Sequence, residues 1–216
     1  MYTKHRWESD RWHNFGYVVN LPENYDETKT YPLVFFLHGA GERGENLDSV
    51  ATHGYMRYVR EQGKQYPFLF VAPQCPDPQY WGCYTESLLA FIDYICDTYP
   101  VDRDRVILTG LSMGGTGTWM LAMADPDRFS CIVPICGTGI VWNAKHLAKL
   151  PIRIYHGDDD YIVPFEESVS MLRELTRAGA ADVKLNICYG VGHNAWEVAY
   201  TDDSLIDWML AQKRKD

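Results

Sequence analysis

Residues 106–124 read VILTGLSMGGTGTWMLAMA: an apolar run, a turn of small residues and a second apolar segment. The run at 106–109 predicts a buried strand, and residues 116–124 predict a helix. Ser112 lies between them in a G-x-S-x-G pentapeptide. A sharp strand-to-helix turn crowds the backbone, which favours glycine on both sides of the serine. We expect Ser112 to be a nucleophile presented at this turn; the alternative is a serine that only caps the helix.

Short apolar runs alternate with longer amphipathic segments along most of the chain. The runs predict strands at residues 17–21, 33–37, 68–72, 106–109, 131–135, 152–156 and 184–188, of which the first is an edge strand closed by Pro22. Helical spacing predicts helices at residues 87–98, 116–124, 166–178 and 197–212. This alternation indicates an α/β fold with a mainly parallel central sheet and helices on both faces. The segments between the strands are short, so no large cap domain is expected.

The composition limits the organisation of the chain and its partners. With 216 residues, of which 46% are hydrophobic, the chain suits a single domain over residues 1–216 with a sizeable core. The net charge of -9 argues against a nucleic-acid partner, which would require a basic surface. No run approaches the ~18 apolar residues of a membrane-spanning helix, so no membrane association is expected. The composition leaves the oligomeric state open, a homodimer included.

The cysteines and the N-terminus bear on the compartment. The first residues are polar and lack the apolar segment of a secretory signal, which favours a cytoplasmic protein. A signal removed beforehand would instead mean a secreted or periplasmic protein. Cys131, Cys136 and Cys188 lie in or beside apolar runs and are expected to be buried free thiols. Cys75 and Cys83 flank a loop, and a disulfide between them requires an oxidising compartment.

A serine nucleophile needs a base and an orienting carboxylate. His193 follows the last predicted strand and precedes the last predicted helix, a position from which it can reach a serine at the top of the central strand. His156 ends a strand before Gly157, and we expect a structural role for it. One of the three aspartates at 158–160 is expected to orient the base, and their spacing does not choose among them.

Two backbone N–H groups are needed to stabilise the oxyanion of an acyl-transfer reaction. The first is expected at Met113, directly after the nucleophile. The second is expected from the glycine-rich loop after Leu37, which runs from His38 to Gly44. A loop of this kind is also able to bind phosphate, but the chain contains neither a P-loop motif nor a dinucleotide-binding motif.

Four sequence blocks together resemble the α/β-hydrolases, with the chain order Ser, Asp, His. The blocks are LHGAGERG at 37–44, GLSMGG at 110–115, HGDDDYIVP at 156–164 and GHNAW at 192–196. Within that superfamily the chain is similar to small lidless esterases related to dienelactone hydrolases. It also resembles feruloyl and acetyl-xylan esterases and bacterial proteins known as predicted peptidases or phospholipase/carboxylesterases. The resemblance covers nearly the whole chain from about Tyr17 onward.

The resemblance implies an α/β-hydrolase fold and a catalytic triad of Ser112, His193 and Asp160, with Asp158 as the fallback acid. It also implies that Ala40 supplies the second oxyanion N–H beside that of Met113. The expected function is hydrolysis of short-acyl, aryl or carbohydrate-linked esters through an acyl-enzyme. Two alternatives remain: a serine amidase or peptidase with the same triad, and a non-catalytic ligand-binding scaffold.

Three tryptophans are candidates for lining the substrate cleft: Trp81, Trp142 and Trp196. Each lies in a loop or helix start beyond the carboxyl end of a predicted strand, where ligands bind in parallel sheets. Together they would form an aromatic cleft for a sugar or an aryl acyl group, unless each packs against its own helix. No metal-binding motif is present, so neither a metal nor a cofactor is expected. The expected partner is therefore a small-molecule or carbohydrate-linked ester.

Overall fold

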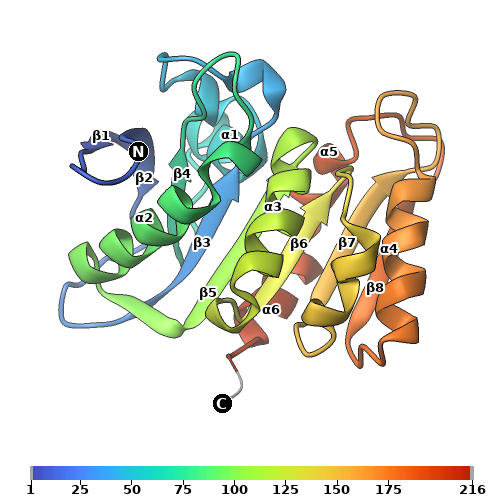
Figure 1. Cartoon of the computed structure of the whole chain (residues 1–216). Helices are drawn as coiled ribbons and strands as arrows, with labels where there is room; N and C mark the ends of the chain where they lie inside the picture. Colours follow the sequence, from blue (N-terminus) through green and yellow to red (C-terminus); the bar gives the residue numbers. More distant parts are fainter. Residues whose placement is uncertain (1, 215–216) are drawn as a thin grey trace.

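A computed structural model describes residues 2–214, and its eight strands form one sheet (Figure 1). The order across the sheet is β1-β2-β4-β3-β5-β6-β7-β8. The strands are β1 (Thr3–Trp7), β2 (Phe15–Asn20), β3 (Tyr31–Leu37), β4 (Leu69–Pro73), β5 (Val101–Leu111), β6 (Cys131–Ile135), β7 (Ile152–Gly157) and β8 (Val183–Cys188). All pairs from β4 to β8 are parallel, whereas β1 pairs with β2 and β2 with β4 in antiparallel orientation. The expected α/β fold with a mainly parallel sheet is confirmed.

Helices cover both faces of this sheet, as Figure 1 shows with α2, α3 and α4 in front of it and α6 behind. The helices are α1 (Gly54–Gln62), α2 (Thr85–Thr98), α3 (Met113–Ala124), α4 (Glu166–Arg177), α5 (Trp196–Ala199) and α6 (Asp203–Ala211). Successive strand residues point to opposite faces. Phe35 of β3 therefore packs in the same core cluster as Phe91 of α2, and Phe36 in the cluster that contains Tyr55 of α1. Burial of both faces explains the continuous apolar runs in the sequence.

The edge of the sheet differs from the expectation. Residues 17–21 were expected to form an edge strand, but β2 pairs on both sides, and β1 forms the edge beside it. The first four side chains of β1 are exposed, and only Trp7 is buried. A strand with one buried side chain has no alternating apolar pattern, which is why the sequence did not reveal it.

The C-terminal helix also differs from the expectation, because residues 197–212 form two helices instead of one. Asp202 lies between α5 and α6 with an extended backbone, and its side chain accepts hydrogen bonds from the Ser204 N–H and the Tyr155 hydroxyl. Aspartate at a helix N-cap satisfies N–H groups that have no partner within the helix. The cap starts a new helix at Asp203. The helical spacing of the apolar residues continues across the break, and for this reason the sequence predicts a single helix.

Short 3-10 helices occupy several connections: η1 (Ala40–Glu42), η2 (Ser49–Ala51), η3 (Trp81–Tyr84), η4 (Pro126–Arg128) and η5 (Val141–Leu147). None of the helices within residues 2–214 has the length and apolar character needed to cross a membrane. All six cysteines lie in this described range and are free thiols, so Cys75 and Cys83 are not bonded to each other.

Candidate active site

Ser112 occupies a tight turn between β5 and α3. Its φ of 54° lies in the left-handed region, which is rare for a residue other than glycine and concentrates at functional sites. The Ser112 N–H donates to the carbonyl of Ile135 on the neighbouring strand (2.9 Å), which holds the turn against the sheet. A Cβ atom at Gly114 would lie 1.8 Å from the carbonyl oxygen of Leu37. Glycine is therefore required where α3 passes over β3.

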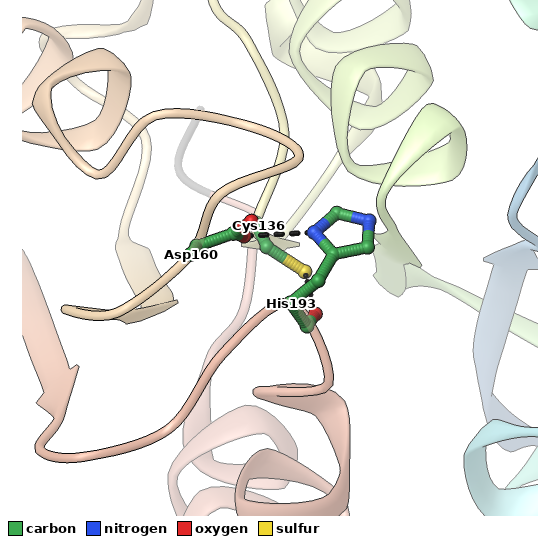
Figure 2. Close-up of side chains that lie close together, drawn as sticks. All are labelled: Cys136, Asp160 and His193. Atoms are coloured by element: carbon green, nitrogen blue, oxygen red, sulfur yellow. Dashed lines mark hydrogen bonds and ion pairs between the residues drawn. The ribbon is translucent and has the colours of Figure 1, made fainter.

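Two further side chains, from separate loops, form a line of hydrogen bonds with Ser112. His193, in the loop after β8, places Nε2 2.8 Å from Ser112 Oγ and Nδ1 2.7 Å from Asp160 Oδ2. Asp160 lies in the loop after β7, and its side chain is fully buried. Figure 2 shows the hydrogen bond between His193 and Asp160, with Cys136 beside it. The fold thus brings together the three residues that the sequence singled out.

The surroundings of Asp160 keep its carboxyl group ionised. Burial by itself raises the pKa of Asp160, but the hydrogen bonds from His193 and from the backbone N–H groups of Val163 and Ile162 outweigh it and lower the pKa. Those two N–H groups donate to Oδ1 at 3.0 and 2.9 Å, which leaves Oδ2 for His193. A carboxylate held in this way fixes the tautomer of the imidazole and stabilises its protonated form. Asp158 instead accepts from the Gly190 N–H.

The two expected oxyanion donors both begin a helix. Met113 is the first residue of α3, and Ala40 is the first residue of η1 in the loop after β3. The N–H groups of the first helical turn have no acceptor within the helix, so both are free to bind an anion. Gly39, just before Ala40, approaches the nucleophile so closely that a Cβ atom there would lie 3.7 Å from the Ser112 Cβ. Met113 and Ala40 thus both belong to segments that lie next to Ser112.

A buried histidine supports the loop that carries Ala40. His38 Nε2 accepts from the Cys75 N–H (2.9 Å), so Nδ1 carries the proton and donates to the Gly39 carbonyl (2.6 Å). Burial lowers the pKa of His38 to about 4, and the ring is therefore neutral near pH 7. The Trp81 indole N–H donates to the His38 carbonyl (2.9 Å). These hydrogen bonds hold the loop next to Ser112, and the buried Glu42 carboxyl group of the same loop lies 4.0 Å from His38 Nδ1.

The three tryptophans have different surroundings. Trp81 does not line an open cleft as expected: it is 1% exposed, because it packs under the His38 loop and against Gly117 of α3. Trp142 in η5 is 77% exposed. Trp196 is half-buried, and its ring packs between His53 and His193. Of the three candidates, Trp142 alone presents a broad aromatic surface to solvent.

Two residues for which the sequence predicted only buried or structural roles also contact His193 or Asp160. The Cys136 thiol donates to the backbone carbonyl of His193 (3.2 Å), and burial raises its pKa, which keeps the thiol protonated. Ligand atoms of Cys136, Asp160 and His193 lie within 4.8 Å of one another (Figure 2). Hydrogen bonds link these three residues to one another. His156, expected to be structural, places Nε2 3.2 Å from Asp160 Oδ2. Its spacing of four residues from Asp160 was the available signal.

The chain is similar to several known hydrolases. Feruloyl esterase C of Emericella nidulans is 30% identical over 164 residues, which cover 72% of this chain and 58% of that protein. Dipeptidyl-peptidase 5 of Aspergillus oryzae is 25% identical over 224 residues, which cover 81% of this chain and 30% of that protein. The crystal structure of a thermostable esterase is 31% identical, with a TM-score of 0.87, and the match covers 99% of this chain and 63% of that chain. The chain thus spans less than two thirds of the length of each of these relatives.

The match to a family model covers nearly the whole chain. The model, described as "Putative esterase", matches residues 13–214, which include the Ser112 turn and the loops that carry Asp160 and His193. The structural match to the thermostable esterase extends over the same sheet and helices. This chain belongs to the esterase family, and its fold is the α/β-hydrolase fold.

Proposed function

We propose that this chain is a serine hydrolase that cleaves carboxylic esters through an acyl-enzyme. The chief support is the unbroken line of hydrogen bonds from Ser112 Oγ through His193 to Asp160. It lies at the carboxyl end of the parallel strands, where ligands bind in sheets of this kind. Membership of the esterase family favours ester substrates.

The proposed reaction has two halves. His193 Nε2 takes the Ser112 proton while Oγ attacks the ester carbonyl carbon, and the N–H groups of Met113 and Ala40 donate to the oxygen that gains the negative charge. The tetrahedral intermediate then loses the alcohol, which departs with the proton from His193. Water attacks the acyl carbon next and gives its proton to His193. Collapse of the second intermediate releases the carboxylic acid and returns the proton to Ser112.

The proposed substrate is an ester of an aryl acid or of a sugar. The exposed indole of Trp142 offers a flat apolar surface for a sugar or aromatic ring to stack on. The feruloyl esterase relative supports the same class of substrate. Trp81 plays no part in this proposal, because its ring is buried in the core.

The test of the reaction is hydrolysis of p-nitrophenyl esters, acetylated xylo-oligosaccharides and methyl ferulate by wild type and by Ser112→Ala. We expect turnover by the wild type and a loss of at least about 10³-fold in the variant, whose fold should be unchanged. Full activity in Ser112→Ala would refute the mechanism. Labelling by a fluorophosphonate without any turnover would point to a non-catalytic scaffold or to an amide substrate.

The test of the substrate class is Trp142→Ala. Removing the indole should lower kcat/KM for methyl ferulate about fivefold, the equivalent of ~1 kcal/mol of aromatic contact, and leave p-nitrophenyl acetate unaffected. Because Trp142 is exposed, the melting temperature should stay within about 2 °C of the wild type. An equal change for both esters would show that Trp142 lies outside the acyl or sugar site.

Amide hydrolysis is the second candidate, and the dipeptidyl-peptidase relative is the observation in its favour. Paired ester and amide substrates with the same acyl group separate the two activities. We expect the ester to be preferred, because the poorer leaving group of an amide requires firmer positioning. Comparable kcat/KM values for both substrates would favour a peptidase or amidase.

A further inference from the structure

A second histidine lies on the far side of Asp160 from His193. His156 is in β7, four residues before Asp160, and its ring is fully buried. Its neighbours are Asp160, the backbone of Val163 and Ser168 of α4, with the edge of the Phe165 ring against it. Ser168 is also completely buried. The side chains of His156, Asp160 and Ser168 are buried, so a hydrogen bond between them is not readily exchanged for one to bulk water.

The contacts of His156 determine which ring nitrogen carries the proton. Nε2 lies 3.0 Å from the Val163 carbonyl oxygen and 3.2 Å from Asp160 Oδ2. A carbonyl and an ionised carboxylate only accept hydrogen bonds, so Nε2 must be the donor. Nδ1 lies 2.6 Å from Ser168 Oγ. In a neutral imidazole this nitrogen is an acceptor, and the Ser168 hydroxyl donates to it.

The carboxylate of Asp160 is therefore held from two sides. Oδ1 receives the N–H groups of Ile162 and Val163, Oδ2 receives His193, and His156 Nε2 lies 3.2 Å from Oδ2. Since His156 also donates to the Val163 carbonyl, it ties the loop that carries Asp160 to the end of β7. Within residues 2–214, His193 is the one side chain that hydrogen-bonds to Oδ2, so His156 acts on Asp160 through this loop and through its N–H group nearby.

We propose that His156, held in its Nε2–H form by Ser168, is a positioning residue for the acid of the triad. A line of contacts then runs from Ser112 through His193, Asp160 and His156 to Ser168, and each step in it is a hydrogen bond except the 3.2 Å contact between Asp160 and His156. This inference rests on the proposed serine hydrolase function and extends it to two residues that lie behind the acid. Their effect on the reaction is transmitted through the orientation and basicity of Asp160.

The kinetic test compares Ser168→Ala, His156→Leu and His156→Gln with wild type on one p-nitrophenyl ester. Ser168→Ala and His156→Leu should lower kcat about tenfold or more with KM nearly unchanged, because the base is misaligned while the substrate site is intact. The acid limb of the pH profile of kcat/KM should move to higher pH in His156→Leu. A carboxylate that has lost the partial positive charge of a nearby N–H group stabilises the adjacent imidazolium more strongly.

Two variants separate positioning from a general effect on packing. His156→Gln places an amide N–H near the position of Nε2 and should restore most of kcat and the wild-type acid limb. Ser170→Ala, two residues from Ser168 in the same helix, is the matched control and should behave as wild type. If His156→Leu fails to fold, Ser168→Ala still tests the proposal, because this substitution removes only one hydroxyl group.

A readout independent of activity is the ¹⁵N NMR spectrum of histidine-labelled protein. His156 should show a protonated Nε2 and an unprotonated Nδ1 in wild type, and a mixture of tautomers in Ser168→Ala. Wild-type kcat, pH profile and tautomer in Ser168→Ala would overturn the inference while Ser112-dependent turnover still stood. A wild type without Ser112-dependent turnover would instead overturn the proposed function.

Discussion

His38 carries the clearest pH dependence at the level of a single residue. Burial lowers its pKa from the ordinary value of 6.5 to about 4 in the folded chain, so the unfolded chain binds more protons between those two values. The free energy of unfolding should therefore fall as the pH is lowered from about 6.5 to about 4, by an amount on the order of 3 kcal/mol from this residue. Urea unfolding curves at a series of pH values measure this loss.

The control is His38→Gln, which lacks the titrating ring. Its stability should change less with pH over the same window, and subtraction from the wild-type curve isolates His38. Asp160 does not interfere, because its pKa is lowered from the ordinary 3.8 and its stabilisation is lost only below that value. Identical pH slopes in wild type and His38→Gln would contradict the assignment of a buried, neutral His38.

At the level of elements, the crossing of α3 over β3 depends on Gly114. Alanine favours a helix over glycine by about 1 kcal/mol, which by itself predicts a more stable Gly114→Ala variant. The Cβ atom would, however, lie 1.8 Å from the Leu37 carbonyl oxygen, and backbone on both sides would have to move. The clash should dominate, with a loss of about 3 kcal/mol or more in urea unfolding, or no soluble protein.

Gly41→Ala in η1 is the comparison for this substitution. Nothing lies within 4 Å of a Cβ atom at Gly41, so its stability should stay within about 0.5 kcal/mol of wild type. If Gly114→Ala were as stable as Gly41→Ala, α3 would not be packed on β3 as closely as described.

At the scale of the whole molecule, the net charge of -9 repels anionic substrates. The Debye length falls from about 30 Å at 0.01 M salt to about 10 Å at 0.1 M salt. For an ester that carries a remote carboxylate, kcat/KM should rise about twofold or more over this range, because the repulsion is screened. A neutral ester of the same shape should show no such rise. A fall for the anionic ester would indicate a local cationic site that outweighs the net charge.

The local pattern of apolar residues and glycines in the sequence determined most of the strands and the turn at Ser112. Strands buried on both faces require continuous apolar runs, and these runs are visible without any partner. The glycines around Ser112 are required because the backbone of this turn packs directly against the backbone of neighbouring strands. The position of His193 after the last strand followed from the order of the elements alone.

Contacts between distant segments decided the rest. Asp160, and not Asp158 or Asp159, reaches His193 because of how the loops after β7 and β8 meet. The edge strand β1 depends on pairing with β2, and Trp81 is buried by the His38 loop and α3. The contact of His156 with Ser168 likewise requires β7 and α4 to pack together. Periodicity reports the average environment of a segment, whereas these features depend on which residue of another segment lies opposite.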